Sequence, residues 1–154
     1  MILTNPVKKR IFDIIFSFIG ILFLIPIIIP FIFLIWLQDF DNPLYIADRV
    51  GLNFKKFKII KLRSMIVKAD KSKVDSTSAN DPIITKIGAI IRKLKLDELT
   101  QLFNVLKGEM SFVGPRPNVE RETDLYSNKE KELLTVKPGI TDFASIVFQM
   151  NQKF

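Results

Sequence analysis

The sequence contains no cysteine and no histidine. The absence of cysteine excludes disulfides, thiolate metal sites and cysteine nucleophiles. The absence of histidine removes the commonest general base and the commonest metal ligand. Any catalysis by this chain must therefore use carboxylates, lysines, hydroxyls or a metal held by oxygen ligands.

Acidic residues are fewer than basic ones: 16 Asp and Glu stand against 23 Lys and Arg, a formal net charge of +7 over 154 residues. This surplus suits a polyanionic partner such as nucleic acid, anionic lipid or a phosphorylated substrate. A basic surface that serves only solubility would have the same composition, so composition does not choose among them. The chain lacks interleaved aromatic and basic residues, and we therefore expect no nucleic-acid partner.

Charge is missing altogether from residues 14–37, a run of 24 residues. As a helix this run would be about 36 Å long, enough to cross the hydrocarbon core of a bilayer. It is too long for a signal-peptide core, and no small-residue cleavage site follows it. A buried helix is the alternative, but a domain this small could hardly cover so uniform a surface. We predict a membrane-inserted segment at residues 1–40 and a separate domain at residues 41–154.

Two prolines, Pro26 and Pro30, lie within this apolar run, and each removes a backbone donor, so the helix is predicted to break there. Lys9 and Arg10 precede the run and are predicted to anchor it at the membrane surface, with the N-terminus on the cytoplasmic side. The segment that follows the run is also rich in Lys and Arg. Because both flanks are basic, we predict a re-entrant helix that enters and leaves the membrane on the same side.

The remaining pattern predicts a mostly helical α+β fold. Two short β-favouring runs at residues 45–50 and 54–61 predict a small hairpin. In its second arm, Lys61 and Arg63 either form a solvated face or line a phosphate site, and the pattern leaves both open. Further along we predict a loop at 68–80, a helix that opens at Asp81-Pro82, a polar helix at 119–134, a turn at 137–141 and a strand or buried segment at 143–148.

Residues 94–117 hold the pattern that is richest in chemistry. Asp97 is predicted to cap a helix that ends at Gly108. Asp97 and Glu98 would then lie at the positive end of a helix dipole, which favours ionised carboxylates and can hold a phosphate. Ordinary helix capping would explain this pair equally well. The apolar stripe of the predicted helix is Leu99, Leu102, Phe103 and Leu106.

Basic residues lie on both sides of this acidic pair. Arg92 ends the preceding predicted helix, where cations stabilise the dipole. Arg116 follows in a turn whose flanking Pro115 and Pro117 restrict the backbone, and its guanidinium is suited to forked recognition of phosphate. Lys137 belongs to a second turn of the same kind. Both turns could equally be simple connections between elements.

Several motifs follow one another along almost the whole chain. They are Lys9-Arg10-x-x-Asp13, Arg49-Val50-Gly51, Lys61-Leu62-Arg63-Ser64-Met65, Leu96-Asp97-Glu98-Leu99, residues 101–108, Met110-Ser111-x-Val113-Gly114-Pro115-Arg116-Pro117 and Lys137-Pro138-Gly139-Ile140-Thr141. In this order they resemble the bacterial sugar transferase family, the monotopic polyprenyl-phosphate phosphoglycosyl transferases.

The resemblance implies transfer of a sugar phosphate from a UDP-sugar to a polyprenyl phosphate such as undecaprenyl phosphate. This step initiates cell-surface glycan synthesis at the bacterial inner (plasma) membrane, with residues 41–154 as a cytoplasmic catalytic domain. Asp97 matches the aspartate that forms a covalent phosphosugar intermediate and binds Mg²⁺, the expected cofactor. Glu98 matches its partner, which assists removal of the acceptor proton. The expected substrate-binding residues are Lys61, Arg63, Arg92, Pro115, Arg116, Pro117 and Lys137.

Three positions depart from the family pattern. Thr100 stands where proline is usual, Ala47-Asp48 where a glutamine commonly precedes the arginine, and Asp142 where glycine is frequent. Family members usually continue beyond this point, so we expect either a C-terminally truncated chain or a natural short form. A homo-oligomer is compatible with the sequence. The alternative to catalysis is a membrane-anchored basic module that binds anionic lipid or protein partners.

Overall fold

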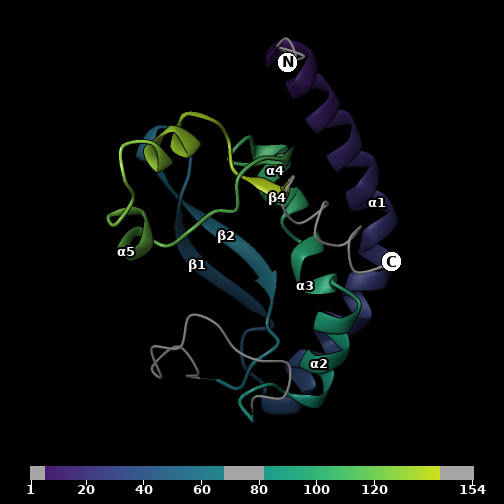
Figure 1. Ribbon diagram of the computed structural model, residues 1–154. Helices are drawn as coiled ribbons and strands as arrows, with labels where there is room; N and C mark the ends of the chain where they lie inside the picture. The colour runs from purple at the N-terminus through teal and green to yellow at the C-terminus, as the bar shows by residue number, and fades with distance from the viewer. Residues whose placement is uncertain (1–5, 68–81, 143–154) are drawn as a thin grey trace, which may run out of the picture.

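The computed structural model describes residues 6–67 and 82–142, so the loop predicted at 68–80 and the segment predicted at 143–148 lie outside the described residues. The described residues form the predicted α+β fold, with one long helix, short helices and two small sheets. The elements are α1 (Pro6–Asp39), β1 (Leu44–Val50), η1 (Leu52–Phe54), β2 (Lys56–Leu62), α2 (Lys86–Lys93), α3 (Leu96–Leu99), α4 (Leu102–Lys107), β3 (Ser111–Val113), α5 (Glu120–Thr123), η3 (Glu130–Thr135) and β4 (Gly139–Thr141). Figure 1 shows α1 along one side of the molecule, the β1–β2 hairpin on the other, and α2, α3 and α4 between them.

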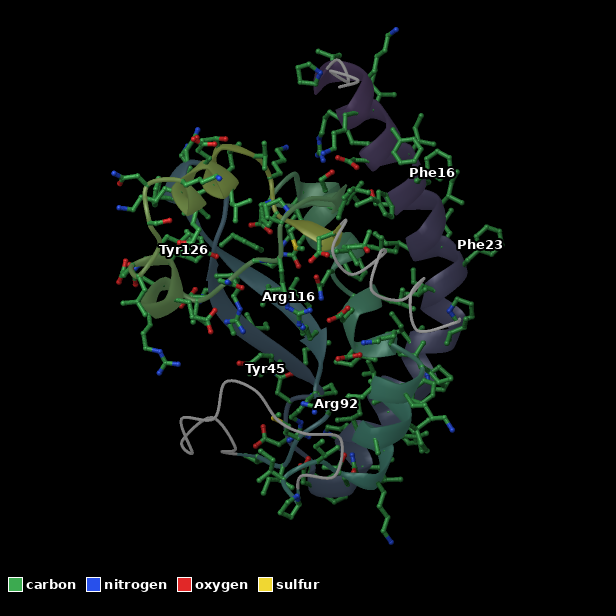
Figure 2. The ribbon with its side chains drawn as sticks, viewed as in Figure 1. Phe16, Phe23, Tyr45, Arg92, Arg116 and Tyr126 are labelled. Atoms are coloured by element: carbon green, nitrogen blue, oxygen red, sulfur yellow. The ribbon has the colours of Figure 1, made fainter. Side chains whose placement is uncertain are left out.

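A narrow stripe of α1 packs against the rest of the chain. Most other large apolar side chains of α1 are exposed, among them Phe16 and Phe23, which point away from the rest of the molecule (Figure 2). Among the described residues, α1 is the one helix that is long and apolar enough to cross a membrane. The buried residues of the stripe are Asp13, Ser17, Ile21, Ile28 and Ile35.

Pro26 and Pro30 lie inside α1, which is a single helix of 34 residues. In place of a break, α1 has a bend. Figure 1 shows this continuous helix changing direction part-way along its length. A proline removes one N–H donor but leaves the flanking turns hydrogen-bonded. Two prolines one turn apart also lie on the same face, so their missing bonds weaken one side of the helix and not a whole turn.

The predicted hairpin is confirmed. β1 and β2 pair antiparallel from Leu44 opposite Leu62 to Val50 opposite Lys56. The connection is longer than predicted, because Phe54 lies in the 3₁₀ turn η1 and not in the second strand. Phe54 has a positive φ of 61°, which ends strand geometry at that residue.

The helix predicted to open at Asp81-Pro82 begins later, at Lys86. Thr85 is its N-cap, and the Thr85 side chain accepts a hydrogen bond of 2.9 Å from the Gly88 backbone N–H. Ile84, which lies within the span predicted as helix, instead forms a β-bridge with Met65. Tertiary pairing therefore displaces the helix start by one turn.

The single helix predicted after Asp97 is two short helices, α3 and α4, and Gly108 ends α4 with a φ of 91°, as predicted. The polar helix predicted at 119–134 is also two pieces, α5 and η3. Between them the backbone N–H and hydroxyl of Ser127 both donate to Glu130 Oε2, at 2.8 and 2.7 Å, which starts a new turn. The turn predicted at 137–141 contains strand β4, which pairs in parallel with β3.

Two apolar clusters hold these elements together, and β2 contributes to both. In the first, Leu62 packs with Ile28 and Ile35 of α1 and with Ile91 and Leu96. The second cluster consists of Phe57 and Ile59 of β2 with Val105 and Met110. Helices α3 and α4 are thus held between α1 and β2, and this position fixes where the acidic pair lies.

Candidate active site

The acidic pair lies just after a sharp change of chain direction between α2 and α3. Lys95 has a positive φ of 57° there, and its N–H donates to the Arg92 carbonyl at 3.1 Å. Lys95, not Asp97, is the N-cap of α3, and it makes no side-chain capping bond. The predicted capping role of Asp97 is therefore wrong, because the αL residue at the end of α2 starts α3 two residues earlier. Asp97 and Glu98 lie within the first turn of α3.

Asp97 is half-buried, and its Oδ1 is a buried atom with no hydrogen-bond partner among the described residues. Burial raises the pKa of Asp97 above its usual value, and the charge of Lys61 opposes that rise. Cations and a helix start were expected to favour the ionised form, but burial outweighs them. The result is a carboxylate that is more basic than an exposed aspartate.

Glu98 connects three parts of the chain. Its Oε1 lies 3.5 Å from Lys61 Nζ on β2 and 3.7 Å from Arg116 Nη2 in the proline-flanked turn. The Lys61 side chain is only 21% exposed, and burial lowers the pKa of its ammonium. Arg116 is 69% exposed, so its guanidinium is accessible to a ligand.

A pocket of about 660 Å³ surrounds these side chains. Figure 2 shows Tyr45, Arg92 and Arg116 between the β1–β2 hairpin and helices α2 and α3. Pro115 lines a neighbouring cavity of about 300 Å³, which Arg116 also lines. The candidate site residues that line the larger pocket are Lys61, Arg63, Arg92, Asp97, Glu98, Arg116 and Pro117.

Two of these cations, Arg63 and Arg92, have hydrogen-bond partners outside the acidic pair. Both terminal nitrogens of Arg63 donate to the Asp39 carboxylate, at 2.8 and 2.6 Å. The Nε of Arg63 is buried and has no partner among the described residues. Arg92 Nε donates to Ser64 Oγ at 2.9 Å, and the charge of Arg92 also acts on Asp97. Arg63 is therefore bound to the end of α1, whereas the charge of Arg92 acts on Asp97.

Lys137 is not brought to this pocket. Burial lowers the pKa of Lys137, and the charges that act on it are those of Arg10, Asp13 and Lys9, near the start of α1. Lys137 is absent from the lining of both described cavities. A turn motif does not specify which elements it packs against, so the sequence could not separate Lys137 from the cations of the pocket.

Lys9 and Arg10 bind the protein itself. Lys9 Nζ donates to the Val113 carbonyl at 3.0 Å. Arg10 donates to the carbonyls of Val105 and Leu106, at 2.6 and 2.8 Å, in the last turn of α4. The Val105 carbonyl also accepts a hydrogen bond of 3.0 Å from the Gly108 backbone N–H. Arg10 thus binds carbonyls at the negative end of the helix dipole, where a cation stabilises the helix. The role of Lys9 and Arg10 as membrane-surface anchors stays a prediction.

The bacterial sugar transferase family matches residues 4–154 of the chain. The chain belongs to this family. It is 46% identical, over 79% of its length, to a Bacillus subtilis protein provisionally named undecaprenyl-phosphate N-acetylgalactosaminyl 1-phosphate transferase. It is 39% identical to the UDP-galactose-lipid carrier transferase of Erwinia amylovora over 86% of the chain, and 40% identical to the undecaprenyl-phosphate glucose phosphotransferase of Komagataeibacter xylinus over 92%. The matches span 68%, 31% and 28% of these three relatives.

Several residues hold the site together in ways that the sequence did not predict. Asp39 binds Arg63, and Asn104 and Thr100 bind the backbone of β2. Asp13, only 3% exposed, accepts hydrogen bonds from Ser111 Oγ and the Phe112 N–H at 3.2 and 3.3 Å. The position of Asp13, directly before a long uncharged run, indicates a buried or paired carboxylate. The local pattern gives no such indication of the contacts made by Asp39, Thr100 and Asn104.

A divalent cation would have few protein ligands here. The described residues contain no cluster of three or more Asp or Glu side chains. Asp97 does offer a carboxylate oxygen without a partner. Mg²⁺ commonly uses one or two carboxylates and completes its shell with substrate phosphates and water. The donor set of this pocket therefore fits Mg²⁺ bound together with a phosphorylated substrate.

Proposed function

We propose that this chain transfers a sugar phosphate from a UDP-sugar to a polyprenyl phosphate, the first step of a cell-surface glycan. The names of the three relatives, each a lipid-carrier or undecaprenyl-phosphate transferase, support this reaction class. The observation that carries the proposal is the convergence of Asp97, Glu98, Lys61 and Arg116 in one pocket of a molecule that also has an exposed apolar helix.

In the first half of the reaction, a carboxylate oxygen of Asp97 attacks the β-phosphorus of the donor. The bond from that phosphorus to the bridging oxygen of the diphosphate breaks, and uridine monophosphate leaves with the bonding electrons. The product on the protein is an aspartyl phosphosugar. The raised pKa of Asp97, caused by burial, supports this role because a more basic carboxylate is a better nucleophile.

In the second half, an oxygen of the polyprenyl phosphate attacks the same phosphorus. The bond from Asp97 to phosphorus breaks, the carboxylate is restored, and the sugar is left on a polyprenyl diphosphate. Glu98 accepts the proton of the acceptor phosphate, as the adjacent residue on α3. Lys61 and Arg116 lie next to Glu98 and would offset the negative charge that the two substrates bring together.

We also propose that the cofactor is Mg²⁺, held by Asp97 together with substrate phosphate oxygens. When bound, Mg²⁺ neutralises charge on the diphosphate and polarises its phosphorus. The unpartnered Oδ1 of Asp97 supports this assignment. The chain's own residues supply the nucleophile, the proton acceptor and the flanking cations.

The membrane position proposed for α1 is re-entrant, with the pocket on the cytoplasmic side. The two ends of α1 support it, because Arg10 binds α4 near the first and Asp39 binds Arg63 at the second. Both ends are thus held by the same folded unit. A straight helix across the hydrocarbon core would place them on opposite sides of the membrane.

The decisive experiment incubates the detergent-solubilised chain with undecaprenyl phosphate, Mg²⁺ and a panel of UDP-sugars, and measures release of uridine monophosphate. Asp97→Asn is expected to abolish release while folding and membrane attachment persist. Asp48→Asn, at an exposed ion pair outside the pocket, is the control and should match the unaltered chain. Undiminished release by Asp97→Asn would reject the covalent mechanism. If no UDP-sugar yields uridine monophosphate and the chain binds anionic vesicles less tightly as salt increases, the result would favour the membrane-anchored basic module.

A further inference from the structure

The outer edge of β2 is paired by side chains instead of a third strand. β1 and β2 form a two-stranded sheet, so one edge of β2 has no strand neighbour. On that edge Asn104 Nδ2 donates to the Lys58 carbonyl at 2.7 Å, and Asn104 Oδ1 accepts from the Ile60 N–H at 3.1 Å. Thr100 Oγ1 then donates to the Ile60 carbonyl at 2.9 Å. Asn104 is fully buried and Thr100 is 2% exposed.

The Thr100 hydroxyl also contacts the segment that carries the acidic pair. It lies 3.1 Å from the backbone carbonyl of Asp97, while its main acceptor is the carbonyl of Ile60. Ile60 directly precedes Lys61. One hydroxyl therefore joins the backbone of Asp97, the proposed nucleophile, to Ile60, the strand residue that precedes Lys61.

The same two elements meet again through side chains, in the ion pair between Lys61 and Glu98 at 3.5 Å. α3 is only four residues long, too short to be stable through its own hydrogen bonds. Its position therefore depends on contacts with its neighbours. Asn104 holds α4 to β2, and Thr100 is the corresponding contact beside α3 itself.

We propose that Thr100 is a positioning residue for the transfer reaction: its hydroxyl sets the separation between the acidic pair on α3 and Lys61 on β2. The inference rests on the proposed function and adds a residue that acts through Asp97 and Lys61 without touching substrate. Loss of the hydroxyl leaves the partly buried Ile60 carbonyl without its side-chain donor and lets α3 shift relative to β2. The chemical step is then affected more than substrate binding.

The φ of Thr100 is −64°, the value that a proline ring imposes. A proline would restrict this backbone covalently, without any bond to β2. In this chain the threonine hydroxyl restrains the same junction through a hydrogen bond.

The test compares Thr100→Val, which removes the hydroxyl at nearly constant shape, with Thr100→Ser, which keeps it. The matched control is Thr123→Val, because Thr123 is also buried and its hydroxyl donates to a carbonyl of its own turn, outside the pocket, at 2.9 Å. For each variant, kcat and the KM for the UDP-sugar are measured by release of uridine monophosphate. Melting temperature in detergent is measured in parallel.

We expect Thr100→Val to lower kcat about 10- to 100-fold with little change in KM, since small misplacements of reacting groups have effects of this size. Thr100→Ser should recover most of that loss, and Thr123→Val should keep kcat even if its melting temperature falls. If Thr100→Val does not fold, Thr100→Ala replaces it in the comparison with Thr100→Ser. Equal kcat with and without the hydroxyl would overturn the inference. Absence of release by the unaltered chain would instead overturn the proposed function.

Discussion

Asp39 and Arg63 form a two-pronged ion pair that ties the last residue of α1 to the residue directly after β2. The two nitrogen–oxygen distances are 2.6 and 2.8 Å, and the side chains are 31% and 11% exposed. The Arg63 backbone N–H adds a bond of 2.9 Å to the Pro43 carbonyl. The end of the apolar helix is therefore bonded to the wall of the proposed active site.

Replacing Asp39 by asparagine is expected to destabilise the fold by about 2 kcal/mol, because it leaves a mostly buried guanidinium without its counter-charge. Thermal unfolding in detergent measures the effect. Asp48→Asn removes an ion pair whose side chains are 71% and 66% exposed, and should change stability by less than about 1 kcal/mol. Equal melting temperatures for the two variants would contradict the structural importance of the Asp39–Arg63 pair.

The re-entrant position of α1 predicts that both ends of the helix face the same side of the membrane. The chain has no cysteine, so single-cysteine variants Lys8→Cys and Asp41→Cys can be labelled without background. A membrane-impermeant maleimide is expected to label both in inside-out vesicles and neither in sealed right-side-out vesicles. Labelling of the two sites from opposite sides would show instead that α1 crosses the membrane.

The pH dependence of turnover should report the environment of Asp97. Burial raises the pKa of Asp97, and the positive charge of Lys61 lowers it. Lys61→Met removes that charge, so ionisation becomes harder, and the acidic limb of kcat should move to higher pH. Lys58→Met, on the same strand but exposed, should leave the limb in place. A shift of the Lys61→Met limb to lower pH would contradict the electrostatic coupling.

The left-handed backbone of Lys95 predicts a stability difference between two truncations. Lys95→Ala and Lys95→Gly both remove the ammonium, but alanine keeps the Cβ atom that is unfavourable at a φ of 57°. Lys95→Gly is expected to be more stable than Lys95→Ala by about 1 kcal/mol. Thermal unfolding of the pair isolates the backbone strain from the loss of charge. A less stable glycine variant would show that the turn before α3 is not strained.

Local sequence determined several of the protein's secondary-structure elements. The uncharged run at residues 14–37 predicted the long exposed helix, because continuous apolar side chains are readable without knowing any partner. Two short β-favouring runs predicted the hairpin, and Gly108 predicted the end of α4 through its freedom to adopt positive φ. The adjacency of Asp97 and Glu98 is likewise a property of the sequence.

Only the tertiary structure decided which side chains from distant parts of the sequence contact one another. Arg10 binds carbonyls that lie 95 and 96 residues away, and Asp39 binds Arg63 across 24 residues. Lys137 lies within the influence of Lys9, Arg10 and Asp13 of α1 and does not line the pocket of the acidic pair. The helix predicted to open at Asp81-Pro82 begins at Lys86, because Ile84 pairs with Met65. Such contacts depend on how elements pack, and hydrophobic period and turn chemistry specify elements but not their neighbours. Asp97 acquired its raised pKa for the same reason, because burial belongs to the packed molecule and not to the residue.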